Sequence, residues 1–252
     1  MRLAFTFVLI AVGSAAQTPT VLDSMPETLE TRYALSALPP HLRADATLQL
    51  LDPKKGYSVK RKGTNGFNCI VVRSDWQFSE RSFRNDIYWS VCYDLEGSKT
   101  LLQDYLTAAE LRAQGMDARQ VNQQITKKFN TAAYPNPSRI GVAYMIAPIV
   151  RTVDDRNVPE PKTMNMPHYM FYAPNVKNAD IGGKPLSQYP FMLSMSPGRD
   201  DYLIMLVGEA EKAKILIEHK DLLADLCSYR EFLCTNDTTR MQMPTKTGAP
   251  QQ

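Results

Sequence analysis

The sequence predicts an α+β fold that combines an antiparallel sheet meander, a helical hairpin and a long C-terminal helix. Three observations predict it. Short strand-like runs separated by turn residues fill residues 47–73, two helical patterns fill 101–129, and a helical apolar stripe runs through 209–232. Strands and helices are mixed without strict alternation, which favours α+β over a parallel α/β arrangement.

The chain opens with the three-part layout of a secretory signal peptide. A basic start at Met1-Arg2 leads into the apolar run Leu3–Val12 and then into small residues that end at Ala16. This run is shorter than the roughly 20 apolar residues of a membrane-spanning helix, and no later segment is long and apolar enough either. We therefore expect a signal peptide over 1–16, a secreted or periplasmic location, and no integral membrane segment in the mature chain.

Residues 17–240 are expected to form a single globular domain, and residues 241–252 a disordered tail. Hydrophobic residues make up 44% of the chain and charged residues 22%, as in ordinary globular proteins. The tail is polar and contains proline and glycine, as chain ends without fixed structure often do. The formal net charge of +3 identifies no partner and argues against a dedicated nucleic-acid binder.

The first elements of the domain are a helix and three strands. Helical spacing over Glu27–Leu38 ends at Pro39-Pro40, because proline cannot continue a helix. Turn residues then separate the three strand-like runs, which are Thr47–Leu51, Tyr57–Lys62 and Phe67–Arg73. The second turn contains Asn65-Gly66, a strong hairpin signal. The three strands are therefore predicted to form an antiparallel meander.

A helical hairpin follows. The first helix is predicted over Leu101–Gln114, and Gly115 can end it in the left-handed conformation. Asp117 can cap the second helix, with Gln120 three residues on in a capping-box arrangement. The apolar residues of the second helix share one face: Val121, Ile125 and Phe129.

The C-terminal half is predicted to contain buried strands and one long helix. The strand-like runs are Gly141–Val150, Asn165–Ala173 and Tyr202–Val207. The long helix is expected from Glu209 to about Phe232. Its apolar stripe consists of Ile215, Leu222, Leu226, Tyr229 and Leu233.

Four cysteines in an exported chain indicate two disulfides, and three pairings are open. Cys69 and Cys92 lie in neighbouring strand-like runs, which favours a bridge between them. A continuous helix would separate the Cα atoms of Cys227 and Cys234 by about 10.5 Å. A disulfide tolerates only about 4.4–6.8 Å, so the helix must end or bend if these two pair. A zinc site is the competing interpretation, but the sequence lacks the close Cys-x-x-Cys pairs that such sites use.

Two segments carry a resemblance to other proteins. One contains Leu38-Pro39-Pro40-His41-Leu42-Arg43, Asp52-Pro53-Lys54-Lys55-Gly56-Tyr57 and Gly63-Thr64-Asn65-Gly66-Phe67. The other runs from Met166 to Asn175 and continues with Asn178-Ala179-Asp180-Ile181-Gly182. Together they resemble an uncharacterised group of secreted bacterial proteins over about Leu35 to Cys234. The resemblance implies a bacterial, exported protein, and it implies no activity or catalytic residue.

The chain lacks the local motifs of several enzyme classes. It contains no Gly-x-Ser-x-Gly, His-Glu-x-x-His or Ser-x-x-Lys sequence, and no phosphate-binding glycine loop. This pattern favours a non-catalytic binding or structural module. An extracytoplasmic hydrolase is the alternative, because catalytic residues need not be adjacent in sequence. His41 or His168 in a deep pocket, with an acidic or serine partner, would favour the hydrolase.

One further hypothesis concerns copper, since no other cofactor is indicated. In a continuous strand, side chains alternate between faces, so one face would carry Met164, Met166, His168 and Met170. Thioethers and imidazole are suitable ligands for Cu(I). Pro167 opposes this arrangement because it implies an edge strand or a bulge. The competing interpretation is that these methionines fill an irregular core.

Overall fold

The computed structural model describes residues 22–77, 81–130, 135–153, 160–184, 187, 189–193 and 202–235. The expected signal peptide and the expected C-terminal tail lie outside the described residues. Within these described ranges, no helix combines the length and apolar character needed to cross a membrane.

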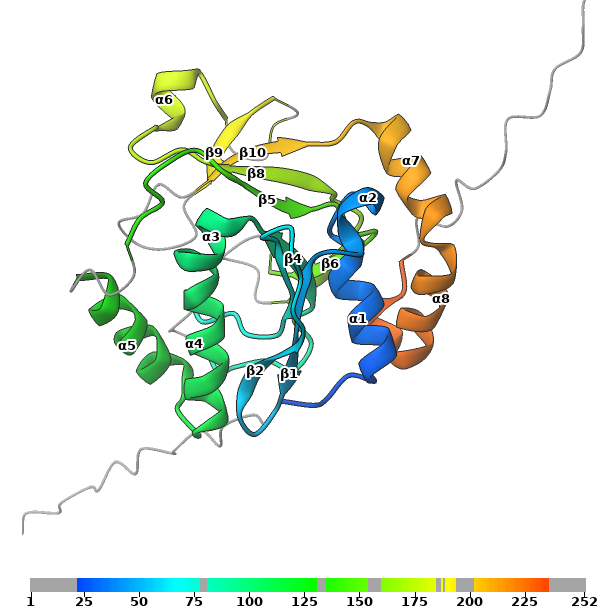
Figure 1. The fold of residues 1–252 in the computed structure, drawn as a ribbon, viewed down its shortest axis with the longest axis horizontal. Helices are drawn as coiled ribbons and strands as arrows, with labels where there is room; N and C mark the ends of the chain where they lie inside the picture. Colours follow the sequence, from blue (N-terminus) through cyan, green and yellow to red (C-terminus); the bar gives the residue numbers. More distant parts are fainter. Residues whose placement is uncertain are drawn as a thin grey trace, which may run out of the picture.

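A mixed sheet of eight strands forms the centre of the molecule, which confirms the α+β class (Figure 1). Its strand order is β2-β1-β3-β4-β5-β8-β10-β9. The strands are β1 (Thr47–Asp52), β2 (Gly56–Arg61), β3 (Asn68–Val72), β4 (Trp89–Tyr93), β5 (Val142–Met145), β8 (His168–Tyr172), β9 (Phe191–Leu193) and β10 (Tyr202–Leu206). Two further strands, β6 (Val150–Thr152) and β7 (Lys162–Met164), pair in a separate antiparallel ribbon.

The predicted meander is wrong at its third strand. β3 pairs with β1 in parallel, whereas a meander would place β3 beside β2. The chain from β2 returns to the start of β1 because the backbone N–H groups of Thr64 and Asn65 both donate to the Asp45 carbonyl oxygen. Gly63 permits this close crossing, since a Cβ atom there would overlap the backbone of residues 45–47.

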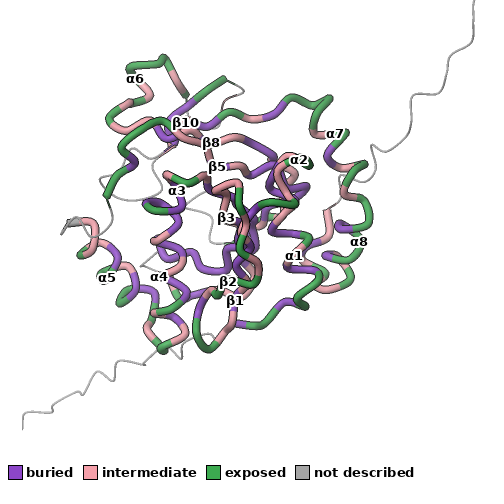
Figure 2. The backbone as a smooth tube through the Cα atoms, viewed as in Figure 1, coloured by how far each residue is buried: buried purple, intermediate pink, exposed green. Residues whose placement is uncertain are grey.

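Helices cover both faces of the sheet (Figure 1). On one face lie α1 (Glu27–Ser36) and α8 (Lys220–Tyr229), and on the other lie α3 (Leu95–Lys99), α4 (Leu102–Ala113) and α5 (Ala118–Asn130). Because strand side chains alternate, neighbouring residues of β3 enter different cores. Cys69 and Val71 pack on the α1 side, while Ile70 and Val72 pack on the α4 side. Buried residues therefore concentrate on both sides of the central strands (Figure 2).

The helical hairpin forms as the sequence predicts. Asp117 Oδ1 accepts a hydrogen bond from the Gln120 backbone N–H at 2.8 Å. In return, the Asp117 backbone N–H donates to Gln120 Oε1 at 2.9 Å, which completes the capping box at the start of α5. Val121 and Ile125 are fully buried, so the predicted apolar face of α5 is its core-facing side.

The predicted long C-terminal helix is divided into α7 (Glu209–Glu218) and α8. His219 lies between the two helices with φ −104° and ψ 18°, outside helical geometry. Arg43 Nη2 lies 3.2 Å from His219 Nε2 at this break. The helix therefore breaks where Arg43, from a distant part of the chain, contacts His219. The continuous apolar stripe gave no sign of this break.

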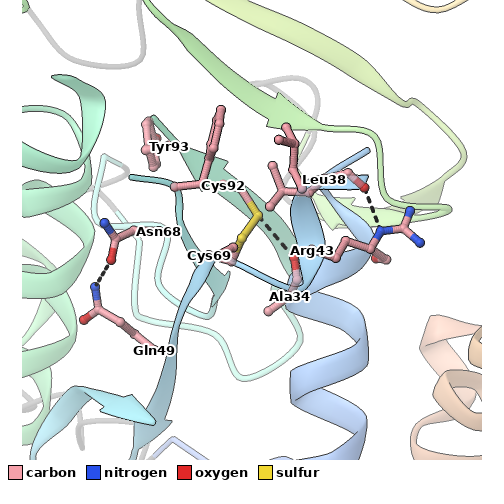
Figure 3. Close-up of a disulfide and its surroundings, with 12 residues drawn as sticks. Ala34, Leu38, Arg43, Gln49, Asn68, Cys69, Cys92 and Tyr93 are labelled. Carbon is pink, nitrogen blue, oxygen red and sulfur yellow. Dashed lines mark hydrogen bonds between the residues drawn. A yellow bond between two sulfur atoms is a disulfide. The ribbon is translucent and has the colours of Figure 1, made fainter. Parts of the chain in front are cut away.

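Both expected disulfides are present. Cys69 and Cys92 are directly opposed in the β3–β4 pair, with a Cα–Cα distance of 4.1 Å. Their bridge lies in the fully buried α1-side core, where Cys92 Sγ is 3.5 Å from the Ala34 carbonyl oxygen (Figure 3). Cys227 and Cys234 pair because α8 ends at Tyr229 and a 3-10 turn, η1 (Glu231–Leu233), brings the chain back.

The two edges of the main sheet are treated differently. At one edge, β2 carries exposed polar and charged side chains, including Lys60. At the other edge, α6 (Asn178–Ile181) lies against β9, as Figure 1 shows. The Asn178 amide donates to the Met192 carbonyl oxygen at 2.9 Å and accepts from the Met192 N–H at 2.8 Å. This side chain therefore satisfies the outward backbone groups of Met192.

The segment that precedes α1 is held by a buried arginine. Arg73 is 1% exposed, and its Nη2 donates to the Tyr88 hydroxyl at 2.6 Å and to the Asp23 carbonyl oxygen at 3.0 Å. Leu22 and Met25 are buried on either side of Asp23. These contacts join the start of the described chain to the end of β3.

Candidate functional site

The segment predicted to be a metal-binding strand is split between two sheets. Met164 belongs to β7 of the small ribbon, whereas His168 and Met170 belong to β8 of the main sheet. Met166 lies in the connection between them. The prediction of one continuous strand is therefore wrong, while copper binding by these residues stays a prediction.

A bend between the two strands has a clear local cause. Asn165 Nδ2 donates to the Pro148 carbonyl oxygen at 2.5 Å, which draws the chain toward the end of β5. Pro167 has no N–H to offer a ladder, but its carbonyl oxygen accepts from the Val207 N–H at 3.1 Å. The proline was the sequence signal for this interruption.

His168 is buried at the start of β8 with a defined ring orientation. Its Nδ1 lies 2.7 Å from the Met166 carbonyl oxygen, so Nδ1 carries the hydrogen and Nε2 keeps its lone pair. Burial lowers the pKa of His168, although the contact with the Met166 carbonyl opposes the shift. The imidazole is therefore neutral near pH 7.

Two methionines share the His168 face of the sheet. Met145 of β5 lies directly opposite His168 in the ladder, and Met170 follows two residues later on the same strand. Met145 is 7% exposed and Met170 is 4% exposed. Met164 and Met166 are half-buried and pack against the core cluster to which these two methionines belong.

An open groove of about 510 Å³ lies beside β7. Three consecutive β7 residues line it, together with one residue of β6 and the chain around η1. The lining residues are Arg151, Lys162, Thr163, Met164, Glu231, Phe232, Cys234 and Thr235. The groove thus offers a strand backbone, an aromatic ring, a thioether and charges of both signs.

Arg151 connects the ribbon to Asp86 and to Phe232. Its Nη2 donates to Asp86 Oδ2 at 2.9 Å, its Nη1 donates to Thr163 Oγ1 at 3.2 Å, and its guanidinium lies 4.8 Å from the Phe232 ring centroid. Burial alone would raise the pKa of Asp86. The hydrogen bonds and charges of Arg84 and Arg151 together lower it, so Asp86 stays ionised.

The outer edge of β7, the strand that lines this groove, carries backbone hydrogen-bonding groups that point away from β6. Arg151 uses its own N–H and carbonyl oxygen to bond Tyr88, at 2.6 and 2.9 Å. Bonded and non-bonded pairs alternate in an antiparallel ladder, so the pair of Arg151 with Thr163 is a non-bonded one. The Thr163 N–H and carbonyl oxygen therefore point away from β6. The described part of the chain supplies a partner to neither group.

The Cys227–Cys234 bridge closes the opposite wall. It holds its two Cα atoms 4.4 Å apart and fixes η1, which carries Phe232. The Phe232 carbonyl oxygen accepts a hydrogen bond from Thr163 Oγ1 at 2.5 Å. The disulfide, the ribbon and the groove therefore form one local unit.

The histidines do not form a hydrolytic constellation within the described ranges. The His168 ring contacts a backbone carbonyl, and His219 lies near Arg43 and Glu218 at the break between α7 and α8. His41 is exposed in the short helix α2 (Pro40–Arg43). Where the structure describes the chain, no Asp, Glu or Ser side chain hydrogen-bonds His41 or His168. The hydrolase alternative stays a prediction without support from this geometry.

Sequence reasoning missed the residues that shape the groove. Arg151 follows an apolar run, Thr163 precedes a methionine, and Phe232 falls on an expected helix, so no local pattern connects them. Long-range pairing of β6 with β7 and with Tyr88 brings the first two together. Only the Cys227–Cys234 spacing hinted that the chain turns near Phe232.

No family model, curated protein or solved structure matches the chain. The resemblance to secreted bacterial proteins therefore stays a prediction, and the function has to be argued from the geometry of the site.

Proposed function

We propose that this chain is an exported, disulfide-stabilised, non-catalytic module that binds an extended polypeptide segment as an added strand on β7. The observation that carries the proposal is the orientation of the Thr163 N–H and carbonyl oxygen, which point away from β6 on a strand that lines an open groove. An exposed strand edge binds extended peptides through main-chain hydrogen bonds, with side-chain pockets adding specificity.

The walls of the groove favour a segment with an apolar anchor. Phe232 and Met164 provide an aromatic ring and a flexible thioether for one such side chain. Lys162 and Glu231 carry opposite charges, so the groove does not select for a strongly charged segment. β7 has only three residues, and a single outward residue supplies one pair of main-chain bonds. The affinity should therefore depend on the anchor as well as on the backbone.

Two variants at Thr163 separate the backbone from the side chain. Thr163→Pro removes the outward N–H, and proline is tolerated on an edge strand where the N–H faces away from the ladder. Thr163→Val keeps that N–H and removes only the hydroxyl. A random heptapeptide display library selected on the wild-type protein supplies the probes, and their affinities are then measured against all three proteins.

Both variants lack the hydroxyl that bonds the Phe232 carbonyl, so the comparison between them isolates the N–H. Selected peptides should bind Thr163→Pro about tenfold more weakly than Thr163→Val, as expected when a hydrogen bond worth about 1.4 kcal/mol is lost. The proposal would be rejected if the peptides bound all three proteins equally. It would also be rejected if selection on the wild-type protein enriched peptides no more strongly than selection on Thr163→Pro. Concentration-dependent dimerisation that is lost in Thr163→Pro would instead identify a second copy of the chain as the occupant.

A further inference from the structure

We infer that Met145, His168 and Met170 form a binding site for Cu(I) on the α4-side face of the sheet. This inference is independent of the proposed peptide groove, because it rests on a different set of side chains. It also changes the ligand set expected from sequence: Met145 of the neighbouring strand replaces Met164, which lines the groove.

The three side chains are brought together by the ladder and the pleat. Met145 and His168 are directly opposed, and opposed residues of an antiparallel pair have Cβ atoms about 4.5–5.5 Å apart. Met170 lies two residues from His168 and therefore shares its face. The position is diagonal to Met145, within reach of a long side chain. All three side chains are buried, so water is largely excluded from around them.

The imidazole is prepared to act as a ligand. Its Nδ1–H donates to the Met166 carbonyl oxygen, which fixes the tautomer and leaves Nε2 as the available donor atom. Histidine ligands of metals commonly donate their second ring N–H in this way.

The composition of the donor set selects a soft ion. Thioethers favour Cu(I), whereas Zn(II) and harder ions require thiolate, imidazole or carboxylate donors in larger number. Both cysteine pairs are oxidised in the structure, so no thiolate is available to compete. No cluster of three or more His, Cys, Asp or Glu side chains suited to a metal occurs in the residues that the structure describes.

Two half-buried methionines pack against the same core cluster as the proposed ligands. Met164 packs against the core cluster that contains Met145 and Met170, and it also lines the open groove. Met166 is likewise half-buried against that cluster.

The test is a titration of metal-free protein with Cu(I), kept reduced by ascorbate and competed with bicinchoninate. Ag(I) serves as the redox-inert probe, and methionine methyl groups labelled with carbon-13 report where it binds. Met145→Leu and Met170→Leu remove one thioether each with little change of volume. Met205→Leu is the matched control, because Met205 lies in the same sheet, 41% exposed, on the face opposite to His168.

The wild-type protein should bind one equivalent of metal, and the methyl signals of Met145 and Met170 should shift. Each of their leucine variants, and His168→Gln, should weaken binding by roughly tenfold or more, while Met205→Leu should leave the affinity unchanged. If His168→Gln fails to fold, the two leucine variants still decide the matter. Equal affinities in Met145→Leu, Met170→Leu and Met205→Leu, or shifts confined to other methionines, would overturn the inference.

Discussion

Glu30 shows how a single buried carboxyl group can make the stability of this fold depend on pH. The residue is 2% exposed in α1, and its Oε1 accepts a hydrogen bond from the Leu51 N–H at 3.1 Å. Burial raises the pKa of Glu30 from 4.5 to about 7, against the opposing effects of the Leu51 bond and the charge of Arg73. The folded protein therefore keeps this proton at pH values where the unfolded chain has released it.

Replacement of Glu30 by glutamine should remove this pH dependence. The contribution of Glu30 to stability is complete below pH 4.5, falls as the pH rises toward 7, and is constant above that value. At about 1.4 kcal/mol per pKa unit, the decline amounts to about 3 kcal/mol. Urea unfolding of wild type and Glu30→Gln between pH 4 and about 8 should show the variant gaining relative stability across this window.

The comparison with the variant is needed because histidines act in the opposite direction. Burial lowers the pKa values of His168 and His219, so their contribution to the stability of the folded protein is lost as the pH falls rather than as it rises. The difference between wild type and variant cancels their effect. Glu27→Gln, an exposed change in the same helix, is the control. A difference curve for Glu30→Gln that shows no change between pH 4.5 and about 7 would contradict the argument.

At the scale of elements, α5 has the clearest local start signal in the molecule. Both hydrogen bonds of the Asp117–Gln120 capping box form, and they satisfy two backbone N–H groups at the helix start. The element was predictable because every interaction that begins it lies within four residues of sequence.

Asp117→Ala should destabilise the protein by about 0.5–2 kcal/mol through loss of the cap. Asp117→Asn should be nearly neutral, because asparagine caps helices as well as aspartate does. Equilibrium unfolding in urea measures both changes. Equal losses in the two variants would show that the charge of Asp117, rather than its capping geometry, stabilises α5.

Other elements could not be predicted because distant residues decide them. Asn65-Gly66 is a hairpin signal, but the bonds from residues 64 and 65 to Asp45 send the chain to β1 instead. The apolar stripe of the C-terminal helix continues through His219, yet the helix breaks there beside Arg43. The candidate sites follow the same rule. Pro167 predicted a bend. The pairing of Met145 with His168, and the direction of the Thr163 N–H and carbonyl oxygen, depend instead on strand pairing between remote segments.

For the molecule as a whole, the main sheet separates two cores of different composition. The α1-side core contains the Cys69–Cys92 bridge together with Tyr33 and Tyr88, whereas the α4-side core contains Trp76 and Trp89. A disulfide between adjacent strands of the sheet centre suits a protein that folds in an oxidising compartment. We therefore keep export as part of the proposed function.

Export predicts a defined mature chain that begins at Gln17. Intact-mass measurement of protein recovered from the exported fraction of the host should give the mass of residues 17–252 with both disulfides formed. Mass is preferable to chemical sequencing, because an N-terminal glutamine can cyclise and block the reaction. Recovery of a chain that retains Leu3–Val12, or that carries four free thiols, would contradict the prediction.

Asn178 has a consequence for how this protein behaves at high concentration. An open strand edge is a template on which another chain can continue the ladder and begin an aggregate. The Asn178 amide supplies the donor and the acceptor that a ninth strand would bring to Met192, but a side chain offers no second residue from which a ladder could grow. At the β9 edge, the backbone groups of Met192 are thus already bonded and cannot pair with a further strand. A single amide group thereby occupies the two hydrogen-bonding positions of Met192 through which a second chain would add to this edge.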